Sequence, residues 1–242
     1  MNQPLYVIGD IHGQMAMLDV ALDRIAADGG ADAPMISLGD LVDRGPDSRA
    51  VIDTLLTGQA EGRDWTVLKG NHDRMFQNFI EDARLHDARV LSGVDWLNPR
   101  LGGVATLASY GIDGAEKYIP EDLATATRQA VPATHLEFLQ AMPLYHQVGN
   151  LLFVHAGITP GVPLDRQTED DLLWIRAPFL DHTEPHPWLV VHGHTALQAP
   201  AHYGNRINLD SGAGYDRPLT VAVFEQDKVW TLGPDGRKPL LP

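Results

Sequence analysis

Carboxylate, imidazole and amide side chains recur in this sequence directly after short apolar runs. Asp10 and His12 follow the first of these runs, residues 5–8, and a single residue separates them. Alternation in an extended segment would point both side chains toward a common place. Comparable polar residues follow four later apolar runs: Asp40, Asp43 and Arg44, then Asn71 and His72, then His155, and finally His194. Oxygen and nitrogen donors without sulfur suit Mn²⁺, Fe or Zn²⁺ better than a soft metal ion.

The candidate metal ligands are more numerous than one ion requires once water takes a position. They are Asp10, His12, Asp40, Asn71, His155 and His194. A carboxylate such as that of Asp40 can bridge two ions, which in such centres lie about 3.5–4 Å apart. A pair of ions lowers the pKa of a shared water toward neutrality, aims that water at phosphorus and neutralises the phosphate oxygens. The chemistry predicted is therefore hydrolysis of a phosphate ester by direct attack of a metal-bridging hydroxide.

Composition removes several other classes of function. The sequence contains no cysteine, which excludes disulfides, thiolate metal sites and cysteine nucleophiles. Its formal net charge of −14 argues against a general nucleic-acid binder, so basic groups that attract an anionic substrate must converge locally. No apolar run is long enough to span a bilayer, and the N-terminus lacks the pattern of a signal peptide. We therefore expect a cytoplasmic protein without a membrane partner.

The polar residues need a scaffold that brings the ends of several strands together. Strand, polar motif and helix alternate three times near the N-terminus, with strands at 5–8, 34–39 and 65–68 and helices over 14–28, from Pro46 to Gly58 and after Asp73. This alternation predicts a largely parallel sheet with helical crossovers, in an α/β protein. The carboxyl ends of such strands share one edge of the sheet, where ligands usually bind.

The rest of the chain predicts a second sheet. Residues 81–142 resemble a helical insertion over the ligand end of the first sheet, and a hairpin follows over 144–154. Residues 188–191 form a buried strand, and three further segments are expected to complete the second sheet as antiparallel strands: 200–209, 219–224 and 228–232. No repeat or linker divides the chain, so one domain over residues 1–242 is the simplest organisation.

Five motifs in order resemble the calcineurin-like metallophosphoesterases: Gly9-Asp10-Ile11-His12-Gly13, Gly39-Asp40-Leu41-Val42-Asp43-Arg44-Gly45, Gly70-Asn71-His72-Asp73, His155-Ala156-Gly157 and Gly193-His194-Thr195. The Asp43-Arg44-Gly45 extension resembles the phosphoprotein phosphatase branch. That branch includes bacterial and phage serine/threonine protein phosphatases and the symmetrical dinucleoside tetraphosphatases. The resemblance implies two packed mixed β-sheets flanked by helices.

The resemblance also implies roles for individual residues. One metal ion would be held by Asp10, His12 and Asp40, and the second by Asp40, Asn71, His155 and His194. The cofactors implied are two divalent ions, Mn²⁺ first, with Fe or Zn²⁺ as alternatives. His72 would be the general acid that protonates the leaving oxygen, oriented by Asp43. Arg44 and Arg176 would hold phosphate oxygens, since a planar guanidinium gives two aligned hydrogen bonds.

The substrate is the most open part of this interpretation. Residues 81–142 carry five Arg or Lys against nine Asp or Glu, which makes a poor cradle for a polyphosphate chain. We therefore expect a phosphomonoesterase of the serine/threonine protein phosphatase type, acting on a phosphorylated protein or a small phosphate ester. The alternative is a symmetrical dinucleoside tetraphosphate hydrolase. A metal-bound binding module without catalysis is a third reading, but a pure binder needs no proton donor such as His72.

Some conspicuous residues have simpler explanations. His192, Trp96, Trp174 and Trp188 are expected to pack in the interior, and the stretch from Asp210 to Tyr215 is expected to be a turn. Asp73 stands where many protein phosphatases of the branch carry Glu, a departure that bears on the substrate more than on the metal chemistry. The oligomeric state stays open.

Overall fold

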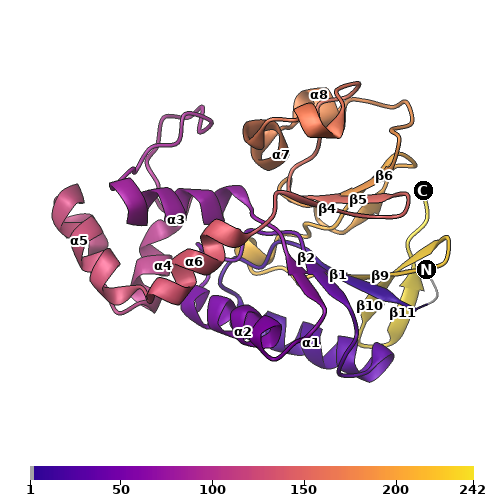
Figure 1. Ribbon diagram of the computed structural model, residues 1–242, viewed down its shortest axis with the longest axis horizontal. Helices are drawn as coiled ribbons and strands as arrows, with labels where there is room; N and C mark the ends of the chain where they lie inside the picture. The colour runs from indigo at the N-terminus through magenta and orange to yellow at the C-terminus, as the bar shows by residue number, and fades with distance from the viewer. Residues whose placement is uncertain (1–2) are drawn as a thin grey trace.

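Two mixed β-sheets pack face to face, with helices on their outer faces, in this computed structural model describing residues 3–242 (Figure 1). The first sheet contains β1 Leu5–Ile8, β2 Met35–Ser37, β3 Trp65–Val67, β9 Val221–Glu225, β10 Lys228–Gly233 and β11 Gly236–Pro239. The second contains β4 Tyr145–Val148, β5 Leu151–Val154, β6 Leu189–His192, β7 Ala201–His202 and β8 Arg206–Asn208. The expected fold class is confirmed.

The parallel strands form one edge of the first sheet and the middle of the second. The first sheet runs β11-β10-β9-β1-β2-β3, and the second runs β4-β5-β6-β8-β7. Strands β1, β2 and β3 are parallel, as are β5, β6 and β8, while the remaining pairings are antiparallel. The carboxyl ends of both parallel sets can therefore contribute to one site.

The chain forms eight α-helices within residues 3–242, all of them in the connections between strands. They are α1 Met15–Gly29, α2 Ser48–Ala60, α3 Asn71–Asp82, α4 Gly103–Ser109, α5 Pro120–Ala130, α6 Ala133–Ala141, α7 Glu169–Trp174 and α8 Ala177–Leu180. Helices α1 and α2 lie against the first sheet, while α7 and α8 lie on the opposite side of the molecule, over the second sheet (Figure 1). Helices α3 to α6 gather beside the first sheet. No helix in residues 3–242 is both long and apolar enough to cross a membrane.

Burial on both faces explains the continuous apolar run of the first strand. Tyr6 and Ile8 pack into the core beneath the helices, whereas Leu5 and Val7 pack between the sheets against residues such as Phe153. Successive side chains of a strand point to opposite faces, so a strand that is covered twice shows no polar alternation.

The partners of the C-terminal strands differ from the expectation. Strands β9 and β10 extend the first sheet, because β9 pairs antiparallel with β1, and the unpredicted β11 follows β10. Only the 200–209 segment joins the second sheet, through β7 and β8. Helix α2 also continues past Gly58 to Ala60, with Gly58 packed on the ring of Trp65. An apolar segment predicts a strand, but its hydrogen-bonding partner depends on the packing of the whole chain.

Arg237 of β11 joins three distant elements. Its guanidinium donates to Asp28 at the end of α1 and to Glu225 of β9, at 2.6 Å and 2.9 Å, and Tyr6 of β1 donates to Asp28 at 2.6 Å. The hydrogen bond from Arg237 lowers the pKa of Asp28 below its usual value. The ionised form of Asp28 is thus favoured by folding.

We expect Arg237→Met to lower the free energy of unfolding at pH 7 by about 1–2 kcal/mol. Because the pKa of Asp28 is depressed in the folded state, this stabilisation is present above about pH 4 and is lost as the pH falls through the folded pKa. Urea unfolding at pH 7 and pH 3 measures the change. Lys238→Met, at an exposed ion pair, is the control and should have little effect. If wild type and Arg237→Met differed in free energy of unfolding by the same amount at both pH values, the prediction would be contradicted.

Candidate active site

Residues from both sheets converge at the carboxyl ends of the parallel strands. Asp10 and His12 follow β1, and Asp40 follows β2. Asn71 and His72 open α3 directly after β3. The second sheet contributes His155 after β5 and His194 after β6, and all seven side chains are buried. The structure therefore brings together the residues that the sequence analysis expected at one edge.

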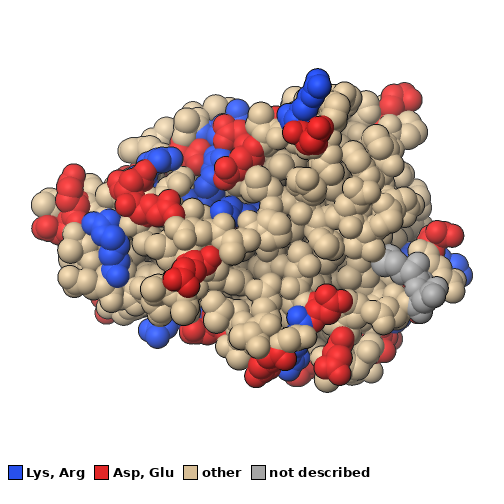
Figure 2. Space-filling model, in the orientation of Figure 1, with Lys and Arg blue, Asp and Glu red and all other residues tan. Residues whose placement is uncertain are grey.

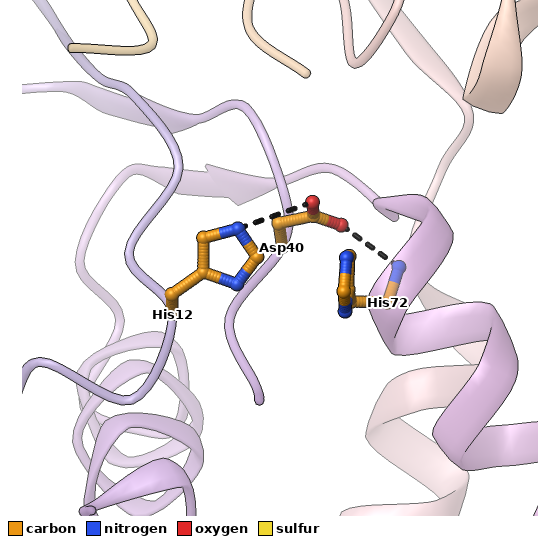
Figure 3. A group of neighbouring side chains, drawn as sticks. All are labelled: His12, Asp40 and His72. Carbon is orange, nitrogen blue, oxygen red and sulfur yellow. Dashed lines mark hydrogen bonds and ion pairs between the residues drawn. The ribbon is translucent and has the colours of Figure 1, made fainter. Parts of the chain in front are cut away.

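Asp40 lies at the centre of two groups of donors. The ligand atoms of His12, Asp40 and His72 lie within 4.8 Å of one another, as do those of Asp40, His155 and His194. One carboxylate oxygen of Asp40 is 3.6 Å from Nε2 of His12, and the other is 3.5 Å from Nε2 of His155. Figure 3 shows the carboxylate between the His12 ring and the backbone nitrogen of His72. A carboxylate shared in this way suits a bridge between two cations.

The imidazoles are oriented by backbone carbonyls. Nδ1 of His12 donates to the carbonyl of Val42, and Nδ1 of His155 donates to that of Leu38, both at 2.9 Å. Each ring then presents the Nε2 lone pair to the cluster, as a metal ligand does. Burial lowers the pKa of His12 well below its usual value, which keeps that lone pair available.

Asn71 and Asp10 complete the cluster in different ways. Oδ1 of Asn71 lies 2.9 Å from Nε2 of His155 and 2.8 Å from Nδ1 of His194. The carboxylate of Asp10 accepts the backbone N–H of His194 at 3.0 Å. It lies outside the two groups around Asp40, so its grouping with His12 stays a prediction. The buried set of carboxylate, amide and imidazole donors fits divalent cations such as Mn²⁺, Fe or Zn²⁺.

His72 and Asp43 form a buried pair beside this cluster. Nδ1 of His72 donates to Oδ2 of Asp43 at 2.6 Å. Burial raises the pKa of Asp43 and lowers that of His72, so the buried site disfavours a charge on either member of the pair. Negative charge from a phosphate next to Nε2 would favour protonation of the ring. His72 also belongs to one of the donor groups around Asp40, so its role as acid stays a prediction.

Two arginines among residues 3–242 line the cavity above the cluster, which has a volume of about 300 Å³. The Arg44 guanidinium donates to Nε2 of His12 at 2.7 Å and to Nε2 of His72 at 3.2 Å. The Cζ atom of Arg44 lies 4.7 Å from the centroid of the Tyr215 ring. Arg176 precedes α8, and its Nη1 donates to the hydroxyl of Thr195 at 3.1 Å. Both guanidinium groups can reach an anion in the cavity.

We expect Arg176→Lys to lower kcat/KM for a phosphate ester by about tenfold, because lysine keeps the charge but loses the planar pair of donors. Steady-state kinetics on one ester provides the measurement. Arg166→Lys makes the same change at an exposed position outside the cavity and should leave the kinetics unaltered. If Arg176→Lys had wild-type kinetics, Arg176 would have no role in holding the phosphate and would be only a charged surface residue.

The backbone of the site adopts an uncommon conformation. Positive φ angles occur at five of its residues that are not glycine: His12, Asp40, Asp43, Arg44 and His194. The left-handed region is costly for such residues and tends to persist at functional sites. The φ of 50° at His12 also shows that the Asp10–His12 segment is a turn, not the extended segment expected from alternation. A turn gives a different route to the same convergence.

Asp73 has a structural role that the sequence analysis missed. Its buried carboxylate accepts the backbone N–H groups of Asp40, Leu41 and Gly70 at 2.8, 2.9 and 2.8 Å. It therefore ties the loop after β2 to the start of α3 and fixes the backbone of Asp40. Asp73 is the third residue of α3, where an acidic side chain can accept the backbone N–H of the N-cap residue, here Gly70.

The sequence analysis missed the contribution of three other residues to the cavity. Asp210 and Tyr215, assigned to a turn, line it, as does Trp174, which is partly buried and packs against the core as expected. The segment from Asp210 to Tyr215 reaches the site because the residue before it, Leu209, packs directly against Gly9. A Cβ atom on Gly9 would stand 2.5 Å from the Leu209 carbonyl oxygen, so only glycine allows this approach. His192 packs as expected: it is fully buried and its ring meets Phe179 edge to face.

Trp96 is also fully buried, as expected, and packs against Phe76 and Phe79 of α3. Its indole nitrogen nevertheless donates to Oδ2 of Asp43 at 2.8 Å. Thr106 of α4 donates to Oδ1 of the same carboxylate at 2.6 Å. Nothing in the local sequence of either residue indicates these contacts.

The chain is similar to known proteins over most of its length. The asymmetrical bis(5'-nucleosyl)-tetraphosphatase PrpE of Oceanobacillus iheyensis is 22% identical, covering 97% of this chain and 93% of its own. Serine/threonine-protein phosphatase 1 of Salmonella typhimurium is 27% identical, covering 91% and 92%. A cold-active protein-tyrosine phosphatase of a psychrophilic Shewanella has a similar fold, with a TM-score of 0.66, 15% identity and coverage of 100% and 81%. Residues 3–227 match the calcineurin-like phosphoesterases, and the chain belongs to that family of phosphoester hydrolases.

Proposed function

We propose that this chain is a dinuclear-metal phosphoesterase that hydrolyses phosphomonoesters, of the serine/threonine protein phosphatase type. The observation that supports the proposal is Asp40, whose carboxylate lies between two groups of buried donors and beside His72. A pure binding module would have no use for the His72–Asp43 pair next to such a cluster. Mn²⁺ is the first candidate for both ions, with Fe or Zn²⁺ as alternatives.

When bound, two divalent ions would lower the pKa of a shared water and neutralise the phosphate oxygens. Arg44 and Arg176 would orient the phosphate from the cavity side. Arg44 donates to the Nε2 lone pair of His12 that would hold a cation, so its guanidinium would be available to phosphate oxygens once that lone pair is taken. His72 would give a proton from Nε2 to the leaving oxygen, while Asp43 holds Nδ1 and stabilises the charged ring.

The charges around the cavity favour a single phosphate over a polyphosphate chain. In the neighbouring hollow between α3 and α7, basic and acidic atoms alternate instead of forming a basic surface (Figure 2). Arg74 is paired there with Asp87 and Asp170, at 2.9 Å and 2.7 Å. Arginines neutralised by carboxylates have little capacity left for extra phosphates. Within the cavity itself, Arg44 and Arg176 are the arginines placed to hold a phosphate.

Hydrolysis of a dinucleoside polyphosphate is the second candidate. Trp174 and the exposed ring of Tyr215 border the cavity, and an aromatic ring beside a phosphate site can stack on a nucleobase. The tetraphosphatase relatives of this chain are named asymmetrical, whereas the sequence analysis considered the symmetrical reaction. The products released from such a substrate would distinguish the two reactions.

A direct comparison of substrates tests the proposal. With Mn²⁺ present, we expect kcat/KM for a phosphoserine or phosphothreonine peptide to exceed that for diadenosine tetraphosphate by about tenfold or more. The opposite ratio would replace the first candidate with the second. Tyr215→Leu then provides a further check: its ring also contacts Arg44, so both substrates should slow, but loss of a stacking surface should slow the dinucleotide more.

A further inference from the structure

The carboxylate of Asp43 is held by two residues of the 81–142 insertion. Oδ2 accepts from Nε1 of Trp96 as well as from His72, and Oδ1 accepts from the hydroxyl of Thr106. The Thr106 hydroxyl oxygen also accepts the backbone N–H of Asp43 at 2.8 Å. Thr106 thus contacts both the side chain and the backbone of Asp43. All four residues are buried, so water does not compete for these hydrogen bonds.

The insertion is fitted closely beneath the turn that carries Asp43. The Trp96 ring packs on Phe76 and Phe79 of α3, the helix that begins with Asn71 and His72. Gly103 lies so near the indole that a Cβ atom would stand 2.5 Å from the ring. The carbonyl of Gly102 accepts the backbone N–H of Arg44 at 3.3 Å. These contacts fix Trp96 and Thr106 relative to both His72 and Asp43.

We propose that Trp96 and Thr106 are positioning residues, which hold the Asp43 carboxylate so that Nε2 of His72 faces the leaving oxygen. This inference rests on the proposed function. In the reaction, water adds its OH to phosphorus and the bond from phosphorus to the leaving oxygen breaks. The leaving oxygen takes a proton from Nε2 of the His72 ring, which the bound phosphate has caused to be protonated, and the second proton of the water restores that protonated ring. A misplaced Asp43 would impair this proton transfer more than the attack by water.

Esters with different leaving groups test the inference with matched variants. Thr106→Val keeps the shape of the side chain but removes the hydroxyl, and Thr106→Ser restores it. We expect Thr106→Val to lower kcat on an alkyl phosphate by about tenfold to a hundredfold, and on dinitrophenyl phosphate by less than about threefold. Thr106→Ser should recover most of the loss. Trp96→Phe keeps an aromatic ring without the N–H donor, and it should also lower kcat on the alkyl phosphate more than kcat on dinitrophenyl phosphate.

Thr127→Val is the control for removal of a buried hydroxyl in the same insertion. Thr127 is fully buried in α5, and its hydroxyl donates to the carbonyl of Leu123, away from the site. This variant should treat both esters as the wild type does. Proton NMR of the metal-free protein gives a second readout, because the short bond from Nδ1 of His72 should produce a downfield imidazole resonance. That resonance should persist in Thr106→Ser and shift or broaden in Thr106→Val.

The outcomes separate the inference from the proposed function. An equal loss on both esters in folded Thr106→Val and Trp96→Phe would overturn the positioning role, as would an unchanged imidazole resonance. If Thr106→Val does not fold, Trp96→Phe and Thr106→Ser decide the question through the same ratio of rates. If the wild-type protein hydrolysed neither ester with Mn²⁺, the proposed function would be overturned. The NMR comparison would then still show whether Thr106 fixes the Asp43 carboxylate against His72.

Discussion

Replacement of Asp40 by asparagine should abolish nearly all hydrolysis, with a loss of about 10³-fold or more. Both donor groups of the site share the Asp40 carboxylate, so the substitution weakens two cation sites at once. An asparagine oxygen can still accept the backbone N–H of His72, which Asp40 binds at 2.9 Å. The fold should therefore survive while metal affinity falls.

The measurement combines turnover with metal content. Wild-type protein should lose activity in a chelator and regain it with Mn²⁺, whereas Asp40→Asn should bind less metal and stay inactive. Asp47→Asn makes the same chemical change at an exposed position three residues after Arg44, and should match the wild type. Full activity in rigorously metal-free wild-type protein would exclude the dinuclear mechanism.

Replacement of His72 by asparagine should lower turnover of an alkyl phosphate by about 10²–10⁴-fold. The leaving oxygen of such an ester is a poor leaving group without a proton, and His72 is the residue beside the cluster whose Nδ1 is held by a carboxylate. The loss should be much smaller for dinitrophenyl phosphate, because its leaving group needs little protonation.

Kinetics on both esters, with metal content measured in parallel, separate acid catalysis from metal binding. His146→Asn on β4, outside the cavity, is the control and should leave both rates unchanged. An equal loss on both esters, accompanied by loss of metal, would instead assign His72 as the third ligand beside His12 and Asp40.

The sequence by itself predicted the fold class and the place of the site. Asp10, Asp40 and Asn71 each follow a short strand, and parallel strands end at a common edge whatever the details of packing. Local patterns of this kind contain enough information because strand, turn and helix are set by residues close together in the chain. The recurrence of polar residues at each strand end then indicated the chemistry.

Tertiary structure alone decided the partners of these elements. Strand β9 pairs with β1 over a separation of more than two hundred residues, and no periodicity in either segment specifies that pairing. The Asp210–Tyr215 segment reaches the cavity because it follows β8, and the position of β8 in the second sheet also depends on long-range pairing.

The most consequential contacts missed from the sequence involve Asp43. Trp96 and Thr106 lie 53 and 63 residues away from it, in an insertion whose pattern indicated only helices and a packed ring. Side-chain hydrogen bonds between distant segments leave no periodic trace, because each depends on one donor, one acceptor and the path of the chain between them. The sequence therefore predicted candidate residues for the chemistry, and only the packed structure showed the hydrogen bonds that hold Asp43 and His72 in place.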